Sequence, residues 1–350
     1  EAAKTNNLIV ILKVAVVLFV IFVGFFFIDT DNYVPFIPET VHNADGSSSF
    51  GWSGVVTAAT IVFFAYIGFD AVSTLAEESK NPQKDLPKGM ILSLVICTVI
   101  YILLTLVLTG AVNYRHFDGV GDPLAFIFEP QNLNIGWMQF LVAICAVVAM
   151  TSVLLVFQMG QPRIWMSMSR DGLLPKAFSK MHKKFKTPYI ATIIAGAFVA
   201  IPSLFINIDI VTDLTSIGTL FAFVIVCAGV LTLAPALPEQ RFKLPYINGR
   251  VILPVLFAVF IATFRDRIVH IAEAHDWLFL LFLISTCIIT LYTIAKKWSL
   301  IPILGLLCCM YLMIEIPVNC WKVFIIWMLM GLMIYFLYGY KKSKLNNTNA

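Results

Sequence analysis

The chain has 350 residues, of which 60% are hydrophobic and only 13% are charged, and its mean hydropathy is +0.89. A soluble domain carries about a quarter charged residues, so this composition excludes an ordinary soluble globular protein. Most of the chain is therefore expected to lie in a membrane.

Ten apolar runs bounded by charged residues are candidate membrane helices. Strands of a membrane barrel would alternate apolar and polar residues over about 10 positions, and these runs do not alternate. We therefore predict an all-α polytopic membrane protein with about 10 transmembrane helices, since about 20 helical residues cross a hydrocarbon core. In chain order the runs cover 8–28, 54–76, 89–112, 136–159, 189–206, 215–237, 251–264, 277–295, 300–315 and 322–339.

The first run contains a lysine, Lys13, five residues after its start. An ionisable group in hydrocarbon costs roughly 2.5 kcal/mol or more, so we expect Lys13 to face the interior of the helix bundle. The alternative is that its long side chain reaches the cytoplasmic interface. An interior amine that gains and loses a proton is a candidate coupling group for proton-driven transport.

The second run is interrupted within the stretch "FFAYIGFDAVSTLAEESKNPQKDLPKG" at 63–89. Gly68 is a poor helix former, and Asp70 favours a helix N-terminus, where its carboxylate accepts free backbone N–H groups. Together they predict the end of one half-helix and the start of another. Such breaks at membrane depth are tolerated where they line a cavity or meet a ligand, and they are typical of secondary transporters. The alternative is that a neighbouring helix satisfies both residues.

Loop charge predicts the orientation. Basic residues gather after the second, fourth, sixth and eighth runs and at the C-terminal end, whereas the intervening loops carry only Arg115, Arg265 and Arg267. By the positive-inside rule the basic loops and both ends of the chain face the cytoplasm. The net charge of +4 thus reflects topology, and no nucleic-acid partner is expected.

Two polar motifs are interpreted as cytoplasmic connections. The segment "SRDGLLPKAFSKMHKKFKTP" predicts a turn at Arg170–Gly172, followed by a basic stretch near anionic lipid headgroups. The segment "EESKNPQKDLP" is interpreted as a capped, proline-terminated linker, in which Glu77 and Glu78 form a solvated face.

Enzyme motifs are missing from the sequence. It contains no HExxH, GxSxG or P-loop pattern, and His270 and His275 lack a matching carboxylate or nucleophile. The seven cysteines show neither zinc nor disulfide spacing and are interpreted as small apolar residues. We expect neither an enzyme nor a bound cofactor or metal.

Four stretches together resemble one known family. They are "FFAYIGFDAVSTLAEESKNPQKDLPKGMILSL" at 63–94, "GQPRIWMSMSRDGLLP" at 160–175, "LTSIGTLFAFVIVCAGVLTL" at 214–233, and "PILGLLCCMYLMIEIPVNCWKVFIIWMLMGLMIYFLYGY" at 302–340. These resemble the cationic amino acid transporter family, particularly its bacterial members, within the amino acid, polyamine and organocation superfamily. The resemblance covers essentially the whole chain.

The resemblance implies a LeuT-like inverted-repeat fold that is truncated at its N-terminus. Against the family's fourteen helices, 1–237 would be the transporter core with the fifth to tenth helices. Residues 238–350 would hold the eleventh to fourteenth helices and a cytoplasmic tail. The missing N-terminal helices of a parent chain would be a structural partner that completes the substrate site.

The resemblance also implies which residues bind substrate. In the family, main-chain carbonyls of the broken sixth helix hold the substrate's amino group. These correspond here to Phe64, Ala65 and Ile67, and Tyr66 and Gly68 complete the unwound segment. Because these roles belong to the backbone, side-chain identity there is a loose guide.

Further roles are implied outside that segment. Asp70 matches an acidic position after the break, which implies helix capping first and a place near the substrate or gate second. Lys13 matches a fifth-helix lysine that replaces a sodium ion in proton-coupled members. The hydroxyls of Thr151 and Ser152 would lie near this lysine, and Met150 would touch the substrate.

The implied function is secondary active transport. We expect a proton-coupled permease that carries cationic or small neutral amino acids across the cytoplasmic (inner) membrane, with membrane lipids around it. The alternatives are a gradient-independent amino acid exchanger and a transport-inactive membrane sensor or partner subunit.

Overall fold

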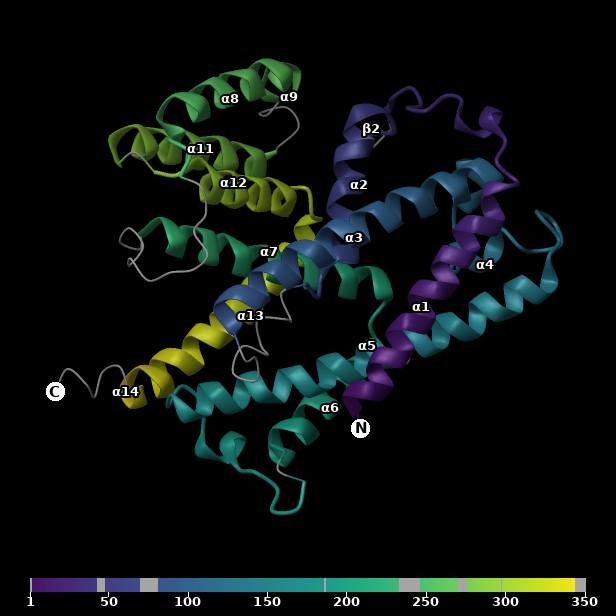
Figure 1. Ribbon diagram of the computed structural model, residues 1–350. Coiled ribbons are helices and arrows are strands. Elements are labelled where there is room, and N and C mark those ends of the chain that lie inside the picture. Colours follow the sequence, from purple (N-terminus) through teal and green to yellow (C-terminus); the bar gives the residue numbers. More distant parts are fainter. Residues whose placement is uncertain are drawn as a thin grey trace.

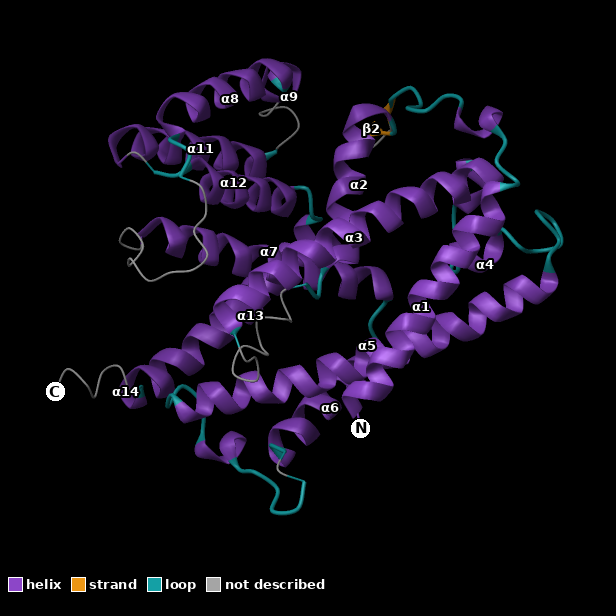
Figure 2. Cartoon of the chain, viewed as in Figure 1, coloured by secondary structure: helices purple, strands orange, loops and turns teal. Residues whose placement is uncertain are grey.

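The structure of the protein is a computed structural model that is nearly all helical (Figure 1). The residues that it describes are 2–42, 48–69, 81–185, 187–232, 246–269, 276–296 and 298–343. Within these ranges the only strands are β1 (Val41–His42) and β2 (Ser48–Ser49), a short antiparallel pair before α2 (Figure 2). The predicted all-α class is confirmed.

Each of the ten predicted runs overlaps a helix. These helices are α1 (Ala2–Phe25), α2 (Gly51–Tyr66), α3 (Pro82–Ala111), α5 (Gly136–Arg170), α6 (Tyr189–Ser203), α7 (Ile208–Thr232), α8 (Gly249–Thr263), α11 (Trp277–Lys296), α12 (Leu300–Ile314) and α13 (Val318–Ile334). Shorter elements connect or extend them: η1 (Thr30–Tyr33), η3 (Tyr114–Phe117), α4 (Pro123–Phe126), η4 (Lys176–Ser179), α9 (Arg265–Val269), the π-helical η5 (Tyr335–Gly339) and α14 (Tyr340–Lys342).

Six segments of the described chain are long and apolar enough to cross a membrane. They lie in α1, α3, α5, α7, α11 and the continuous helix formed by α13, η5 and α14, while α2, α6, α8 and α12 are shorter apolar helices. On α5, Phe140, Val147 and Leu154 recur every seven residues, and all are at least 60% exposed. A helix that hides so little of its apolar surface suits a hydrocarbon solvent, so the protein is a multi-pass membrane protein.

Several helix boundaries differ from the predicted runs, among them the start of α7 at Ile208 instead of 215, and two further differences change an interpretation. Helix α3 begins at Pro82 instead of 89, so the interpretation of "NPQKDLP" as linker is wrong. Pro82 stands in the first turn, where its missing N–H removes no helical hydrogen bond. Helix α5 continues to Arg170 and, at 35 residues, is about 52 Å long. This exceeds the thickness of the hydrocarbon core, so one end projects beyond it.

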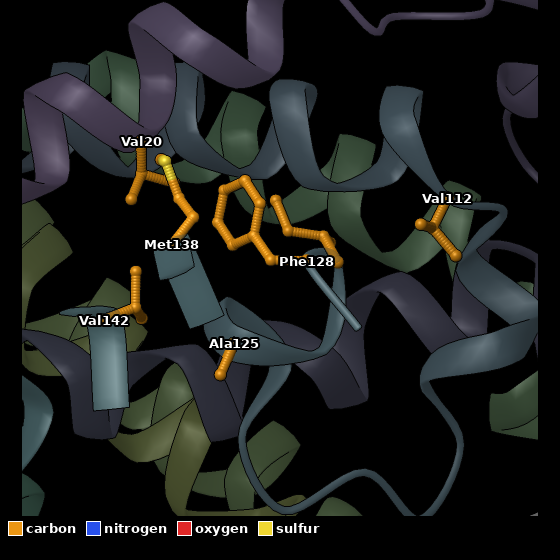
Figure 3. Packing of buried hydrophobic residues seen from close by; sticks show 7 residues of the cluster. Val20, Val112, Ala125, Phe128, Met138 and Val142 are labelled. Carbon is orange, nitrogen blue, oxygen red and sulfur yellow. The ribbon is translucent and has the colours of Figure 1, made fainter. Parts of the chain in front are cut away.

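The N-terminal core lies between α1, α3, α4 and α5. Figure 3 shows Val20 of α1, Phe128, and Met138 and Val142 of α5 packed together, and all four are at most 1% exposed. Gly24 adds a close approach of α1 to α3, because a Cβ there would overlap the Val107 side chain.

The C-terminal helices form further clusters. Helix α12 packs along α7 and joins α13 around the buried residues Ile217, Leu220 and Met313. Helices α8, α11 and α12 meet around Phe279 and Phe282, beside an apolar cavity of about 380 Å³. The predicted boundary at 237/238 lies outside the described residues, and the two-part division stays a prediction.

The predicted turn after α5 is confirmed. Asp171 ends the helix, Gly172 has a φ of +84°, and the Leu173 N–H donates to the Met168 carbonyl at 2.9 Å. A Cβ at Gly172 would overlap the carbonyl oxygen of Lys342, so this turn lies against the end of α14.

Candidate substrate-binding site

The interruption predicted at Gly68 is present as the end of α2. The helix ends at Tyr66, Ile67 is extended (φ −61°, ψ 130°), and its N–H donates to the Phe64 carbonyl at 3.1 Å. Gly68 has a φ of +121°, a backbone conformation that favours glycine. Asp70 and the second half-helix predicted after it lie outside the described residues.

The end of α2 is held by α3, the helix that it approaches in Figure 1. The Tyr101 hydroxyl donates to the Ala65 carbonyl at 3.0 Å, and the Tyr66 hydroxyl donates to Thr98 Oγ1 at 3.1 Å. The rings of Tyr66 and Tyr101 meet edge to face, with centroids 5.4 Å apart. The predicted substrate carbonyl of Ala65 therefore has one protein donor already.

Helix α5 flanks the break on another side. The ring of Phe157 lies 3.8 Å from the position of a Cβ at Gly68. Met150 precedes Phe157 by seven residues and so shares its helix face, and its side chain is 60% exposed. The structure thus places Met150 on the face of α5 that reaches the break, two turns away from Phe157.

The proposed coupling residues lie on α1 and α5, which pack together. Lys13 is half-buried and makes neither a hydrogen bond nor an ion pair with any residue that the structure describes. Ser152 is buried, and the exposed Thr151 donates its hydroxyl proton to the Val147 carbonyl at 2.8 Å. The placement of the Thr151 and Ser152 hydroxyls near Lys13, and the role of Lys13 itself, stay predictions.

Two residues near the break escaped the sequence analysis. Thr98 and Tyr101 lie three positions apart on one face of α3, inside an apolar run. Two hydroxyls on one face of a membrane helix are a weak signal for a polar contact with another helix. Their partners on α2 depend on tertiary packing and could not be read from the sequence.

A cavity of about 410 Å³ adjoins these tyrosines. Tyr66 and Tyr101 line it together with Tyr33 of η1 and Tyr114 of η3. The cavity therefore connects the end of α2 to the loop elements at one end of the helix bundle. Across the described ranges, no cluster of three or more His, Cys, Asp or Glu side chains is placed to hold a metal ion. His270 and His275 lie outside those ranges.

An interrupted helix beside a cavity in a multi-pass helical protein is an arrangement typical of secondary transporters. The family model for "Amino acid permease" matches residues 1–269, and the model for "C-terminus of AA_permease" matches residues 300–343. The chain belongs to the amino acid permease family. This confirms the predicted resemblance, and the matching family is one of permeases, not of enzymes.

Individual relatives are similar over nearly the whole chain. The branched-chain amino acid permease BcaP of Bacillus subtilis (strain 168) is 36% identical over 348 residues, which are 99% of this chain and 61% of that protein. The methylthioribose transporter of the same bacterium is 35% identical over 350 residues, with the same two shares. The mitochondrial cationic amino acid transporter 3 of Arabidopsis thaliana is 34% identical over 245 residues, 70% of this chain and 39% of the relative. The chain spans about three fifths of the bacterial relatives' length.

Proposed function

We propose that the chain forms the larger part of a proton-coupled symporter that carries amino acids across the cytoplasmic membrane, with both of its ends in the cytoplasm. The observation that carries the proposal is the end of α2 at Tyr66, followed by extended Ile67 and by Gly68 with positive φ. The last carbonyls of a helix lack helical N–H partners, and their negative ends attract a cation.

The substrate group that fits these carbonyls is an ammonium. The Ala65 carbonyl accepts a hydrogen bond from the neutral Tyr101 hydroxyl, and a stronger donor can replace that hydroxyl. A charged donor forms the stronger bond with such an acceptor. The α-amino group common to all amino acids supplies this donor, and the side chain would be selected by other walls of the site.

The proposed proton carrier is Lys13. It lies half-buried on α1 and, within the described ranges, has no carboxylate that would fix its charge. A lysine in such surroundings can exchange its proton during a transport cycle. Lys13 would take up a proton from one side of the membrane and release it to the other side. The charge of Lys13 would then be linked to whether the substrate site is occupied.

The names of the relatives indicate more than one substrate. One bacterial relative is named for branched-chain amino acids and another for methylthioribose, at nearly equal identity to this chain. Identity alone therefore does not choose the substrate. We propose cationic or small neutral amino acids, and a competition series with lysine, arginine, alanine, valine and methylthioribose ranks the candidates.

The test is uptake by the intact permease in liposomes. We expect amino acid uptake to rise with an inward proton gradient in the wild type and to lose this response in Lys13→Met. Lys13→Arg keeps a charge that does not titrate and should abolish the response as well. Lys322→Met, which removes an exposed lysine from α13, is the matched control and should behave as wild type.

Other outcomes separate the alternatives. Uptake that ignores the proton gradient but requires amino acid inside the liposomes would replace symport by exchange. Binding of amino acid without uptake would favour a sensor or partner subunit. Wild-type protein that neither binds nor moves amino acids would refute the proposed function.

A further inference from the structure

We propose that Tyr101 and Thr98 of α3 form a latch with Tyr66 and Ala65 of α2, which the substrate opens by competing for the Ala65 carbonyl. This inference rests on the proposed function, in which that carbonyl accepts the substrate's ammonium. The latch would let α3 respond to whether the site is occupied.

The hydrogen-bond directions of the latch are fixed by its chemistry. The single hydroxyl proton of Thr98 goes to the Leu94 carbonyl at 2.8 Å, so Thr98 Oγ1 accepts the proton of the Tyr66 hydroxyl. The Tyr101 hydroxyl gives its own proton to the Ala65 carbonyl. All three hydroxyl protons are therefore donated in hydrogen bonds. Tyr66 donates from α2 to α3, and Tyr101 donates from α3 to α2.

The latch acts on the last turn of α2 and on little else. Ala65 and Tyr66 are the final two residues of the helix, directly before extended Ile67. One contact holds the backbone and the other holds the side chain, while the edge-to-face ring contact sets the distance between the helices. Opening either contact frees the segment whose backbone would bind the substrate.

A substrate can reach the latch through the cavity of about 410 Å³. The rings of Tyr66 and Tyr101 form one side of this cavity, and η1 and η3 residues form another. An ammonium arriving there meets the neutral phenol of Tyr101, whose hydroxyl holds the Ala65 carbonyl. Because a charged donor binds a carbonyl more strongly than a neutral donor, the ammonium displaces the phenol.

The main test compares Tyr101→Phe with Tyr33→Phe in the intact permease. Both changes remove a phenol that lines the cavity and donates to a backbone carbonyl, but Tyr33 donates to Leu106 at 2.6 Å, away from the break. We expect Tyr101→Phe to lower the Kd for the amino acid about three- to tenfold, because a competitor worth one neutral hydrogen bond is gone. Tyr33→Phe should leave Kd within twofold. A Kd for Tyr101→Phe that stays within twofold or rises would overturn the proposal.

A second measurement needs no substrate. Amide hydrogen exchange of the peptide that contains residues 61–69 should be faster in Tyr101→Phe than in the wild type and in Tyr33→Phe. Thr98→Val, which removes the acceptor of Tyr66, should speed exchange in the same peptide and serves if Tyr101→Phe does not fold. Unchanged exchange in both variants would refute the latch. Because this arm is run without amino acid, it still decides the latch if the wild type fails to bind amino acids and the proposed function falls.

Discussion

Arg267 Nη1 donates a 2.5 Å hydrogen bond to Glu315 Oε1, and this pair joins α9 to the C-terminal end of α12. The other side of the guanidinium contacts Asp276 at 2.8 Å, directly before α11, and its Cζ lies 4.3 Å from the Phe279 ring centroid. Burial alone would lower the pKa of Arg267, but the hydrogen bonds and charges of Glu315 and Asp276 outweigh it and raise the pKa. Arg267 therefore stays charged at every working pH.

Arg267→Met should destabilise the junction of α9, α11 and α12. It leaves two carboxylates partly buried without their cation; a fully buried pair would cost about 3–5 kcal/mol, and the exposure of Arg267 reduces this to about 1–3 kcal/mol. Thermal unfolding in detergent measures the loss as a lower Tm. Arg265→Met removes an exposed arginine from the same short helix and should leave Tm unchanged. Equal effects of the two variants would contradict the role of the ion pairs.

Gly172→Ala should weaken the contact between the turn after α5 and the end of α14. Alanine at positive φ costs about 1–2 kcal/mol, and the new Cβ also overlaps the Lys342 carbonyl oxygen. Gly119→Ala is the matched control, because Gly119 has a φ of +71° and nothing within 4 Å of a new Cβ. The Tm should fall further for position 172 than for position 119. Equal losses would mean that the contact with α14 adds nothing.

Gly24→Ala tests the packing of α1 on α3. The added methyl group overlaps the buried Val107 side chain and should cost about 1–3 kcal/mol. In a Val107→Ala background the same change should cost less, with a coupling energy of about 0.5–3 kcal/mol. Gly218→Ala on α7, where a Cβ meets open space, is the control and should be neutral or slightly stabilising. Additive losses at 24 and 107 would contradict the close approach.

The orientation of the loops can be tested by cysteine labelling in intact cells. Asp118→Cys, in the exposed turn after η3, should react with an impermeant maleimide added outside. Lys183→Cys, exposed after η4, should react only after the membrane is permeabilised. Wild-type protein sets the background, since its seven cysteines all lie in helices. The reverse pattern would invert the proposed topology.

The sequence predicted what local chemistry controls. The end of α2 follows from Gly68, because few other residues accept its positive φ, and the Gly172 turn follows for the same reason. The start of α3 was placed seven residues late, because its first turns are polar and contain Pro82 and Pro87, which look like loop.

Contacts between segments that are distant in the chain could not be predicted from the sequence. The bond from Tyr101 to Ala65 joins positions 36 apart and depends on how α2 and α3 rotate and slide against each other. The hydroxyls expected near Lys13 came from the family resemblance. Whether they lie near it depends, in the same way, on how α1 and α5 rotate and slide against each other. Helix periodicity gives the face of a residue, but not the partner that the face will meet.

The contact of Lys342 and Ser343 with the turn after α5 matters to anyone who attaches a reporter close to these residues. A fluorescent domain or affinity tag fused directly to Ser343 would pull on a segment whose backbone touches Gly172. The distortion would lower expression or the unfolding temperature, and this loss would be mistaken for low stability of the permease itself. A flexible spacer before the tag avoids this, and a fusion at the solvent-facing turn near Lys183 offers an alternative attachment point.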